Sequence, residues 1–482
     1  MPSPLDLSPG DSLGPFHLGS LLFNVLNHIR SYRSVYPAAK LAWDDESPSS
    51  SPIHLILTSP PVHLTFCALE QRLCRIELGS ASPGSWVSYR GKRLRDERDD
   101  EEDVVKTVRR VLGPTYGSSQ GTGGAVGVKE EMLSYPGVAF GVINDGAGGS
   151  SLSRIVLTPL PAPPNVPVDQ AWRHPTLPDS PSVAQGDLRI AEILLDSTRK
   201  PSSVILHFHS SPEDPINPIE LRIGSTTSED VLCELGSAVR SFWKEDDRMS
   251  IHNASAPSPS SSDPSMALNP YFLSYPHLGL TLLLSPPQSP SSAPHLVTKI
   301  ILHSNLPGEV NFGRTSRCAW RLASPGHREG GGGGVGVGVG VEDGFEKVRG
   351  MLKPSASSNG GRTPSPNPSP FSNGAHTRLK TKLSNGKKPA SFKEKEVDLL
   401  GLSLNLEDSI RSGASGGSGN VNGSAAESGA AEADEDERPM ILDRTADGGE
   451  GSVKGKTTEI HGFPGIALEV TGSGDVETVW LF

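Results

Sequence analysis

The residues that could support catalysis in this 482-residue chain are few and scattered. A glycine-rich run at residues 330–340 has spacings like those of GxGxxG phosphate-binding loops, but no apolar strand precedes it and no phosphate-binding helix clearly opens on it. Ser415 fits the GxSxG pattern of a hydrolase nucleophile, yet it lies in a Gly/Ser tract with no strand before it and no helix after it. Both runs are interpreted as low-complexity sequence.

Some histidines and acidic residues elsewhere could act as metal ligands or in catalysis, but each group also has a simpler structural explanation. His207 and His209 alternate on a predicted strand and could offer two metal ligands, but no third ligand stands at a suitable spacing, so an ordinary surface face is favoured. The segment KEDDRMSIH at residues 244–252 concentrates acidic, basic and imidazole groups that could perform acid–base work. Because nothing supplies a nucleophile or a cofactor loop, a solvated turn or a partner contact is preferred there.

Composition limits the classes of function. The net charge of -11, with acidic patches at residues 96–103 and 428–437, argues against broad nucleic-acid binding, which needs a basic face. The basic run at residues 378–388 could touch anionic lipid, although a solvated segment is favoured. The cysteines have no CxxC spacing, which favours reduced, buried thiols in a cytosolic protein; they are Cys67, Cys74, Cys233 and Cys318.

The chain shows no targeting or membrane-spanning pattern. Its first residues, MPSPLDLSPGDSLG, lack the basic region and apolar stretch of a secretory signal. No run approaches the roughly 20 apolar residues that a membrane span needs. Any membrane contact is therefore expected to be peripheral or made through a partner.

Three apolar segments share a pattern that suggests internal repetition. Each has an aromatic residue followed by proline and then alternating apolar side chains, and the segments are YPGVAFGV (135–142), YPHLGLTLLL (275–284) and FPGIALEV (463–470). Proline lacks a ladder donor, so the pattern predicts strands that begin at the aromatic residue. A second strand follows each segment, at residues 153–157, 297–303 and 476–482.

A helical pattern precedes each of these strand pairs. The spacing of apolar residues predicts a helix with one buried face in each case, made by Val104, Val108, Val111 and Leu112, by Val231, Leu232 and Leu235, and by Phe345, Val348, Met351 and Leu352. Two of the helices end in Leu-Gly, at Gly113 and Gly236, as a left-handed C-terminal cap requires. The third stops at Pro354.

A more divergent copy occupies the N-terminus, with a helix and then strands at residues 53–57, 62–66 and 72–78. Its helix should bury Leu22, Val25, Leu26 and Ile29. The fold class predicted is α+β, with about four repeated units of a helix and antiparallel strands that form extended sheets with the helices packed on one face. Further strands at residues 187–195, 203–209 and 219–223 are expected to extend the sheet.

Segments rich in Ser, Pro and Gly divide the chain into parts. The entropic cost of closing a loop grows only with the logarithm of its length, so even a long insertion is tolerated at a loop. The predicted parts are units 1 and 2 in residues 1–160, a linker at 161–186, central strands with unit 3 in 187–322, a Gly-rich linker at 323–341, unit 4 split between 342–353 and 459–482, and a disordered insertion at 354–458.

The third unit is distinctive enough to indicate a family. KEDDRMSIHN, NPYFLSYPHLGLTLLL (269–284) and VTKIILHSNLPGEVNFGRTSRC (297–318) resemble, in order and spacing, the core of the phagophore assembly and autophagy-associated factor family. FHLGSLLFNVLNHIRSY (16–32), FCALEQRLCRIEL (66–78) and the final VETVWLF are also similar to it. The long insertions depart from the animal pattern and look like those of a fungal member.

This resemblance implies a binding or adaptor protein and no enzyme. Members of the family form a complex with a phosphoinositide-binding WD-repeat β-propeller protein at the phagophore assembly site, which implies a cytoplasmic protein held at membranes through its partner or a phosphoinositide. The alternatives are a trafficking factor of the trans-Golgi network and, as a minor one, an uncharacterised hydrolase. No cofactor, nucleic acid or small-molecule substrate is expected.

Polar residues around the third unit are the candidate partner-binding site. Because polar side chains in loops are not needed for packing, their presence calls for turn geometry or recognition. The candidates are Asp246, Arg248, His252, His303, Asn305, Asn311 and Arg317. The structural alternative stays open, since Asn305 could form an Asx turn before Pro307 and Asp246 could hold a hairpin.

Overall fold

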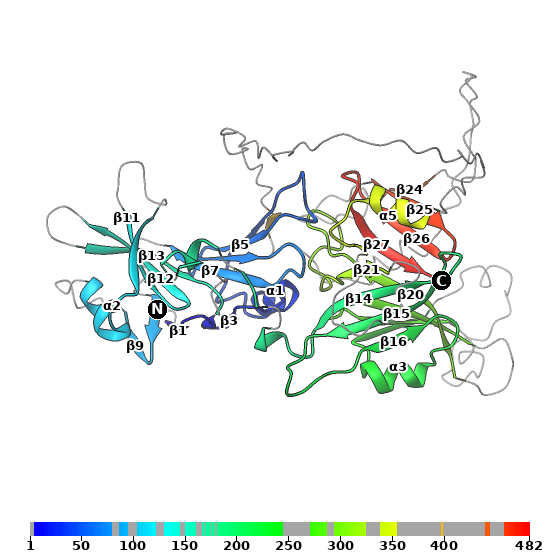
Figure 1. The fold of residues 1–482 in the computed structure, drawn as a ribbon, viewed down its shortest axis with the longest axis horizontal. Helices are drawn as coiled ribbons and strands as arrows, with labels where there is room; N and C mark the ends of the chain where they lie inside the picture. The colour runs from blue at the N-terminus through cyan, green and yellow to red at the C-terminus, as the bar shows by residue number, and fades with distance from the viewer. Residues whose placement is uncertain are drawn as a thin grey trace, which may run out of the picture.

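The structure is a computed structural model with an α+β fold, which confirms the predicted fold class. It describes residues 4–79, 86–94, 104–121, 130–144, 150–160, 166–167, 169–174, 176–178, 181–243, 270–286, 294–323, 338–353, 397–398, 439–443 and 457–482. Two halves lie side by side along the long axis, an N-terminal half (residues 4–160) and a C-terminal half (residues 181–482) (Figure 1).

The N-terminal half contains two helices and two sheets. Its helices are α1 (Leu22–Ser31) and α2 (Val104–Leu112). Its strands are β1 (Leu5–Ser8), β2 (Ser12–Leu13), β3 (Phe16–His17), β4 (Ala39–Ala42), β5 (Ile53–Leu57), β6 (Val62–Phe66), β7 (Leu73–Gly79), β8 (Val87–Tyr89), β9 (Lys92–Arg93), β10 (Gly117–Gly121), β11 (Glu130–Tyr135), β12 (Val138–Asn144) and β13 (Ser150–Leu157). Two 3-10 turns follow, η2 (Ala171–Arg173) and η3 (Ser182–Ala184).

The C-terminal half has the same kinds of element. Its helices are α3 (Ser228–Leu235) and α5 (Phe345–Leu352). Its strands are β14 (Leu188–Leu195), β15 (Pro201–Phe208), β16 (Ile219–Arg222), β17 (Arg240–Trp243), β18 (Tyr271–Tyr275), β19 (Leu280–Ser285), β20 (Leu296–His303), β21 (Trp320–Leu322), β22 (Val339–Gly340), β24 (Met440–Asp443), β25 (Thr457–Phe463), β26 (Ile466–Val470) and β27 (Val476–Leu481), with β23 (Val397–Asp398) between β22 and β24 in the chain.

The two halves share one sheet topology. Each half has a small sheet, with the order β3-β2-β1-β8-β9 in the first half and β16-β15-β14-β21-β22 in the second. Each small sheet contains one parallel pair, which is β1 with β8 in the first half and β14 with β21 in the second. A large antiparallel sheet has the order β10-β11-β12-β13-β7-β6-β5-β4 in the first half, to which β23 is added, and β17-β18-β19-β20-β27-β26-β25-β24 in the second. The elements therefore recur in the same order along the chain.

Each helix that the structure describes is followed by an antiparallel meander of four strands, where the sequence predicted two or three. The last strands of two meanders pair with each other, β7 with β13 and β20 with β27, which joins them into one sheet. The prediction missed the first strand of several meanders, because segments such as GSSQG in β10 lack apolar alternation. That the four arose as copies of one unit stays a prediction.

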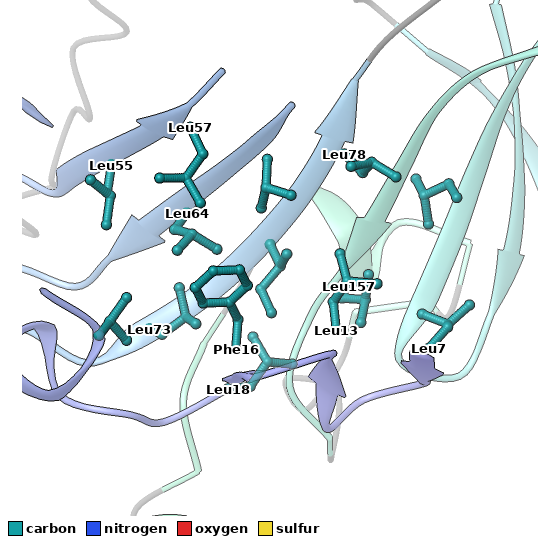
Figure 2. Packing of buried hydrophobic residues seen from close by; sticks show 14 of the residues in the cluster. Leu7, Leu13, Phe16, Leu18, Leu55, Leu57, Leu64, Leu73, Leu78 and Leu157 are labelled. Carbon is teal, nitrogen blue, oxygen red and sulfur yellow. The ribbon is translucent and has the colours of Figure 1, made fainter. Parts of the chain in front are cut away.

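The core of each half lies between its large sheet, its small sheet and its helices. In the N-terminal half, Leu7, Leu13 and Phe16 of the small sheet pack against leucines of β5, β6, β7 and β13 (Figure 2). The predicted helix face of α1 is confirmed, since Leu22, Val25, Leu26 and Ile29 are all buried in this core. A separate core in the C-terminal half joins the two sheets with Val231 of α3 and Val348 of α5.

The aromatic-Pro pairs form hairpin turns, and the prediction that they begin strands is wrong. Tyr135 ends β11 and pairs across the turn with Val138, while Phe463 ends β25 and pairs with Ile466. Proline suits the first central position of such a turn because its φ is fixed, and the glycine that follows takes a positive φ, +77° at Gly137 and +71° at Gly465.

The tyrosines of these turns also explain the Leu-Gly helix ends. Tyr135 donates its hydroxyl to the carbonyl of Gly113 (3.0 Å), and Tyr275 donates its hydroxyl to the carbonyl of Gly236 (3.0 Å). Both glycines have positive φ, but Gly236 has a ψ of -167°, which lies outside the left-handed helical region, so the predicted left-handed cap is not formed at that helix end. The same bond thus ties a helix end to a hairpin turn in each half.

Other expectations need correction. The central strands β14, β15 and β16 form their own small sheet, because β14 pairs in parallel with β21 instead of extending the large sheet. Leu232, predicted on the buried face of α3, is 50% exposed. Within the predicted disordered insertion 354–458, β23 and β24 are strands that pair with β4 and β25; most of that segment lies outside the described residues.

Candidate functional site at the seam between the halves

Two loops meet where the halves touch, and we call this contact region the seam. The first loop, residues 67–72, connects β6 and β7 of the N-terminal half. The second, residues 304–319, connects β20 and β21 of the C-terminal half and carries much of the segment that indicated the family. Each loop places side chains against the other half.

A buried amide pair forms the centre of the seam. Asn305 donates from its Nδ2 to the Oε1 of Gln71 (2.6 Å), and Gln71 donates from its Nε2 to the backbone carbonyl of Asn305 (2.8 Å). The Oδ1 of Asn305 accepts the backbone N–H of Gly313 (2.7 Å). Both amide residues take a positive φ, 52° and 49°, which costs energy for a non-glycine residue. The paired amides offset that cost.

The C-terminal loop also inserts an aromatic side chain into the N-terminal core. Phe312 is 3% exposed and packs with Trp43, whose ring centroid lies 5.9 Å away. Next to it, Arg30 of α1 donates from its Nη1 to the carbonyl of Gly313 (3.0 Å). Gly313 takes a φ of +73°, and a Cβ there would approach Leu26 to 3.0 Å, so the backbone conformation and the close approach both favour glycine.

Arg317 crosses the seam as a buried cation. Its Nη1 donates to the carbonyls of Ser49 (3.2 Å) and Ala68 (2.7 Å), both in the N-terminal half. Its Nη2 donates to the carbonyl of Val341 (3.5 Å). Burial outweighs the nearby acidic groups and lowers the pKa of Arg317 to about 10, so the guanidinium remains charged at neutral pH.

A second buried cation is held by ion pairs. Arg72, 1% exposed, donates to Glu70 (2.9 Å) within its own loop and to Asp187 (3.0 Å) of the C-terminal half. The Nε2 of His209 lies 3.0 Å from the same Glu70 carboxylate. Burial by itself would raise the pKa of Glu70, but the hydrogen bonds and charges of His209 and Arg72 together lower it. Glu70 is therefore a carboxylate that bridges two halves at neutral pH.

The structure places four of the predicted partner-binding residues in or beside this loop. Asn305 and Arg317 are buried and make the internal bonds described above. His303 and Asn311 are half-buried; the ring of His303 lies 3.2 Å from the Thr281 hydroxyl, and Asn311 faces Glu477 at 3.5 Å. The remaining candidates, Asp246, Arg248 and His252, lie outside the described residues. Partner binding at these seven residues stays a prediction.

His207 and His209, which alternate in the sequence, have different neighbours in the structure. His207 lies 3.4 Å from Glu192 at the surface, whereas His209 follows β15 and is 1% exposed in the seam. The prediction of an ordinary surface face is therefore wrong for His209. Sequence reasoning also missed Gln71 and Arg72, because the segment RLCRIEL contains other charged residues and gives Arg72 no distinguishing pattern.

The two buried thiols, Cys74 and Cys318, are not prepared for nucleophilic chemistry. Burial raises the pKa of Cys74 and of Cys318 to about 12, which keeps both protonated at neutral pH. Cys233 is exposed, unlike the prediction of buried thiols. Among the residues that the structure describes, no three His, Cys, Asp or Glu side chains gather as metal ligands, and no helix is long and apolar enough to cross a membrane.

Comparison with known proteins identifies the family. The family model of phagosome assembly factor 1 matches residues 12–482. A PHAF1 protein of Arabidopsis thaliana is 23% identical over 344 residues, which cover 66% of this chain and 75% of the relative. A PHAF1 protein of Drosophila melanogaster is 33% identical over 103 residues, 21% of each chain. No solved structure matches. The resemblance predicted from the third unit is thus confirmed, and the chain belongs to the phagosome assembly factor 1 family.

Proposed function

We propose that this protein is a non-catalytic adaptor of autophagy that acts at the phagophore assembly site, in complex with a phosphoinositide-binding WD-repeat protein. The observation that carries the proposal is the family match over residues 12–482, because a family named for phagosome assembly indicates a part in building a membrane compartment. The seam supports a scaffold role, since its polar groups are used to fix two halves against each other.

The partner surface proposed lies on the C-terminal half beside the seam. Asn305 and Arg317 are buried in the loop 304–319, whereas His303, which directly precedes the loop, and Asn311, within it, are half-buried. Partly exposed polar side chains are typical of the rim of an interface. Membrane contact would then come through the bound partner.

Co-purification after starvation tests this proposal. The tagged protein should retain a WD-repeat protein, and it should gather at sites of autophagosome formation when nutrients are removed. The variant His303→Ala with Asn311→Ala should retain at least ten-fold less of the partner than the parent protein does. Its melting temperature should stay within a few degrees of the parent's.

The matched control is His207→Ala with Asn217→Ala, which removes the same two residue types from the surface of the C-terminal half away from the loop. The control should bind as the parent does. If no propeller protein co-purifies and autophagic flux is unchanged in a deletion strain, the adaptor function is rejected. If both variants bind equally well, only the proposed contact surface is rejected.

A further inference from the structure

The outer edge of β4 differs from the corresponding edge of the other three meanders. The first strand of each meander lies at the outer end of the eight strands that two joined meanders form. These first strands are β4, β10, β17 and β24. Among the described residues, β10, β17 and β24 end their sheets, while β4 carries one more strand, β23. An open edge presents unpaired N–H and C=O groups that can accept an added strand. The chain thus shows such an addition at one of four equivalent edges.

The added strand comes from a distant part of the chain. β23 starts at Val397, 45 residues after α5 ends at Leu352, and it ends at Asp398, 42 residues before β24 starts at Met440. Both α5 and β24 belong to the C-terminal half, whereas β4 belongs to the N-terminal half (Figure 1). The segment between α5 and β24 therefore reaches the opposite half near its midpoint.

The register of the pairing matches residue types across the two strands. Val397 stands opposite Leu41, which is fully buried, and Asp398 stands opposite Lys40, which is exposed. The register therefore matches an apolar pair and an opposite-charge pair of residue types, and such cross-strand pairs stabilise antiparallel neighbours. We therefore expect the edge of β4 to favour a peptide with an apolar residue followed by an acid.

The pairing is also short. β23 contributes two residue pairs to the sheet, whereas β4 and β5 make four. A strand of this length gains little beyond its backbone hydrogen bonds, and its pairing must offset the entropy lost when residues far apart in the chain are brought together. Such a strand can leave the edge without disturbing the core behind it.

The edge lies beside the seam. Trp43 directly follows β4, and its ring packs with Phe312 of the C-terminal half. A peptide on this edge is thus held next to the contact between the halves. We infer that the outer edge of β4 is a docking site for an extended peptide, occupied by the chain's own Val397 and Asp398 as a removable ninth strand. This inference goes beyond the adaptor function and does not depend on it.

Hydrogen exchange of the full-length protein tests the occupancy. Proline lacks the ladder donor, and successive N–H groups of a strand point to opposite sides, so Val397→Pro with Asp398→Pro removes at least one N–H that faces β4. Amides of Ala39–Ala42 should exchange at least ten-fold faster in this variant. The control is Val421→Pro with Asn422→Pro, which places the same change elsewhere between α5 and β24 and should leave these amides unchanged.

Peptide binding tests the site itself. A fluorescein-labelled peptide of residues 392–403 should bind the Val397→Pro, Asp398→Pro variant at least ten-fold tighter than the wild type, in which the edge is occupied. Adding Lys40→Glu to that variant should weaken the binding, because an acid would then stand opposite Asp398 of the peptide. Equal exchange at Ala39–Ala42 in the wild type and the proline variant overturns the occupancy. Equal peptide affinity for these two proteins overturns the docking site.

Discussion

The two halves have the same topology but connect their meanders differently. In the N-terminal half the chain passes from the end of β7 at Gly79 to β8 at Val87, while in the C-terminal half it passes from β20 at His303 to β21 at Trp320. The longer connection is the loop 304–319, which supplies Asn305, Phe312 and Arg317 to the seam. One connection is therefore long enough to contact the other half, while the sheets of the two halves have the same order of strands.

The largest expected effect comes from Phe312→Ala. The ring of Phe312 is part of the N-terminal core although the residue belongs to the C-terminal half, so its loss leaves a cavity beside Trp43. We expect the free energy of unfolding to fall by about 4 kcal/mol, measured by urea denaturation. Tyr116→Ala is the control, because Tyr116 is 69% exposed and should change stability by less than about 0.5 kcal/mol. A change as small as the control's would show that the loop does not anchor the halves.

Arg317→Met should have the next largest effect. Methionine keeps much of the side-chain volume but leaves the buried carbonyls of Ser49 and Ala68 without their donor. We expect a loss of about 3 kcal/mol in urea unfolding, because buried groups without partners are costly. Arg321→Met removes a partly exposed pair with Glu342 and should cost less than about 1 kcal/mol. Equal losses in the two variants would contradict a special role for the seam cation.

Glu70→Gln should weaken the seam in a pH-dependent manner. His209 and Arg72 hold the pKa of Glu70 below its ordinary value, so the stability gained from its charge is present above the unfolded pKa of about 4.5 and is lost as pH falls through the lowered folded pKa. We expect the variant to be about 2 kcal/mol less stable than the wild type at pH 7. The two unfolding curves should converge as the pH falls below 4.5. A difference that is constant with pH would show that the charge of Glu70 is not the cause.

The smallest effect tests the equivalence of the halves. Tyr135→Phe and Tyr275→Phe each remove a hydroxyl that donates to a helix-terminal glycine carbonyl at 3.0 Å. Each should cost about 1 kcal/mol in thermal or urea unfolding. Tyr116→Phe, which alters an exposed ring, should be neutral. If one of the two tyrosines matters and the other does not, the helix-to-turn bond is not a shared device of the two halves.

Elements with a clear local pattern could be predicted from the sequence. The bounds of β5 (Ile53–Leu57) and β6 (Val62–Phe66) agree with the prediction because an apolar residue at every second position, bounded by polar or proline residues, is a local property. The buried face of α1 follows from 3.6-residue spacing in the same way. Where one strand has no such alternation, as in β17 (RSFW), its place in the sheet depends on neighbours distant in sequence.

The seam could not be predicted because its partners are far apart in the chain. Gln71 and Asn305 are separated by 234 residues, and nothing near either one indicates the other. His209 was placed on the surface because its alternation with His207 was extended past the end of β15 at Phe208. The sequence did point to the loop 303–317 as unusual in its polarity, but polarity alone does not distinguish an internal contact from an external one.

Cleavage between the halves tests most directly whether the seam joins them into one unit. A protease site placed between Leu160 and Val166 lies between the described elements, so the folded protein can be cut without a break in any described strand or helix. After cleavage the two fragments should co-elute in size-exclusion chromatography as one species, and Phe312→Ala combined with Arg317→Met should let them separate. If the fragments of the cut wild-type protein elute separately, the seam does not hold the halves together and the account is wrong.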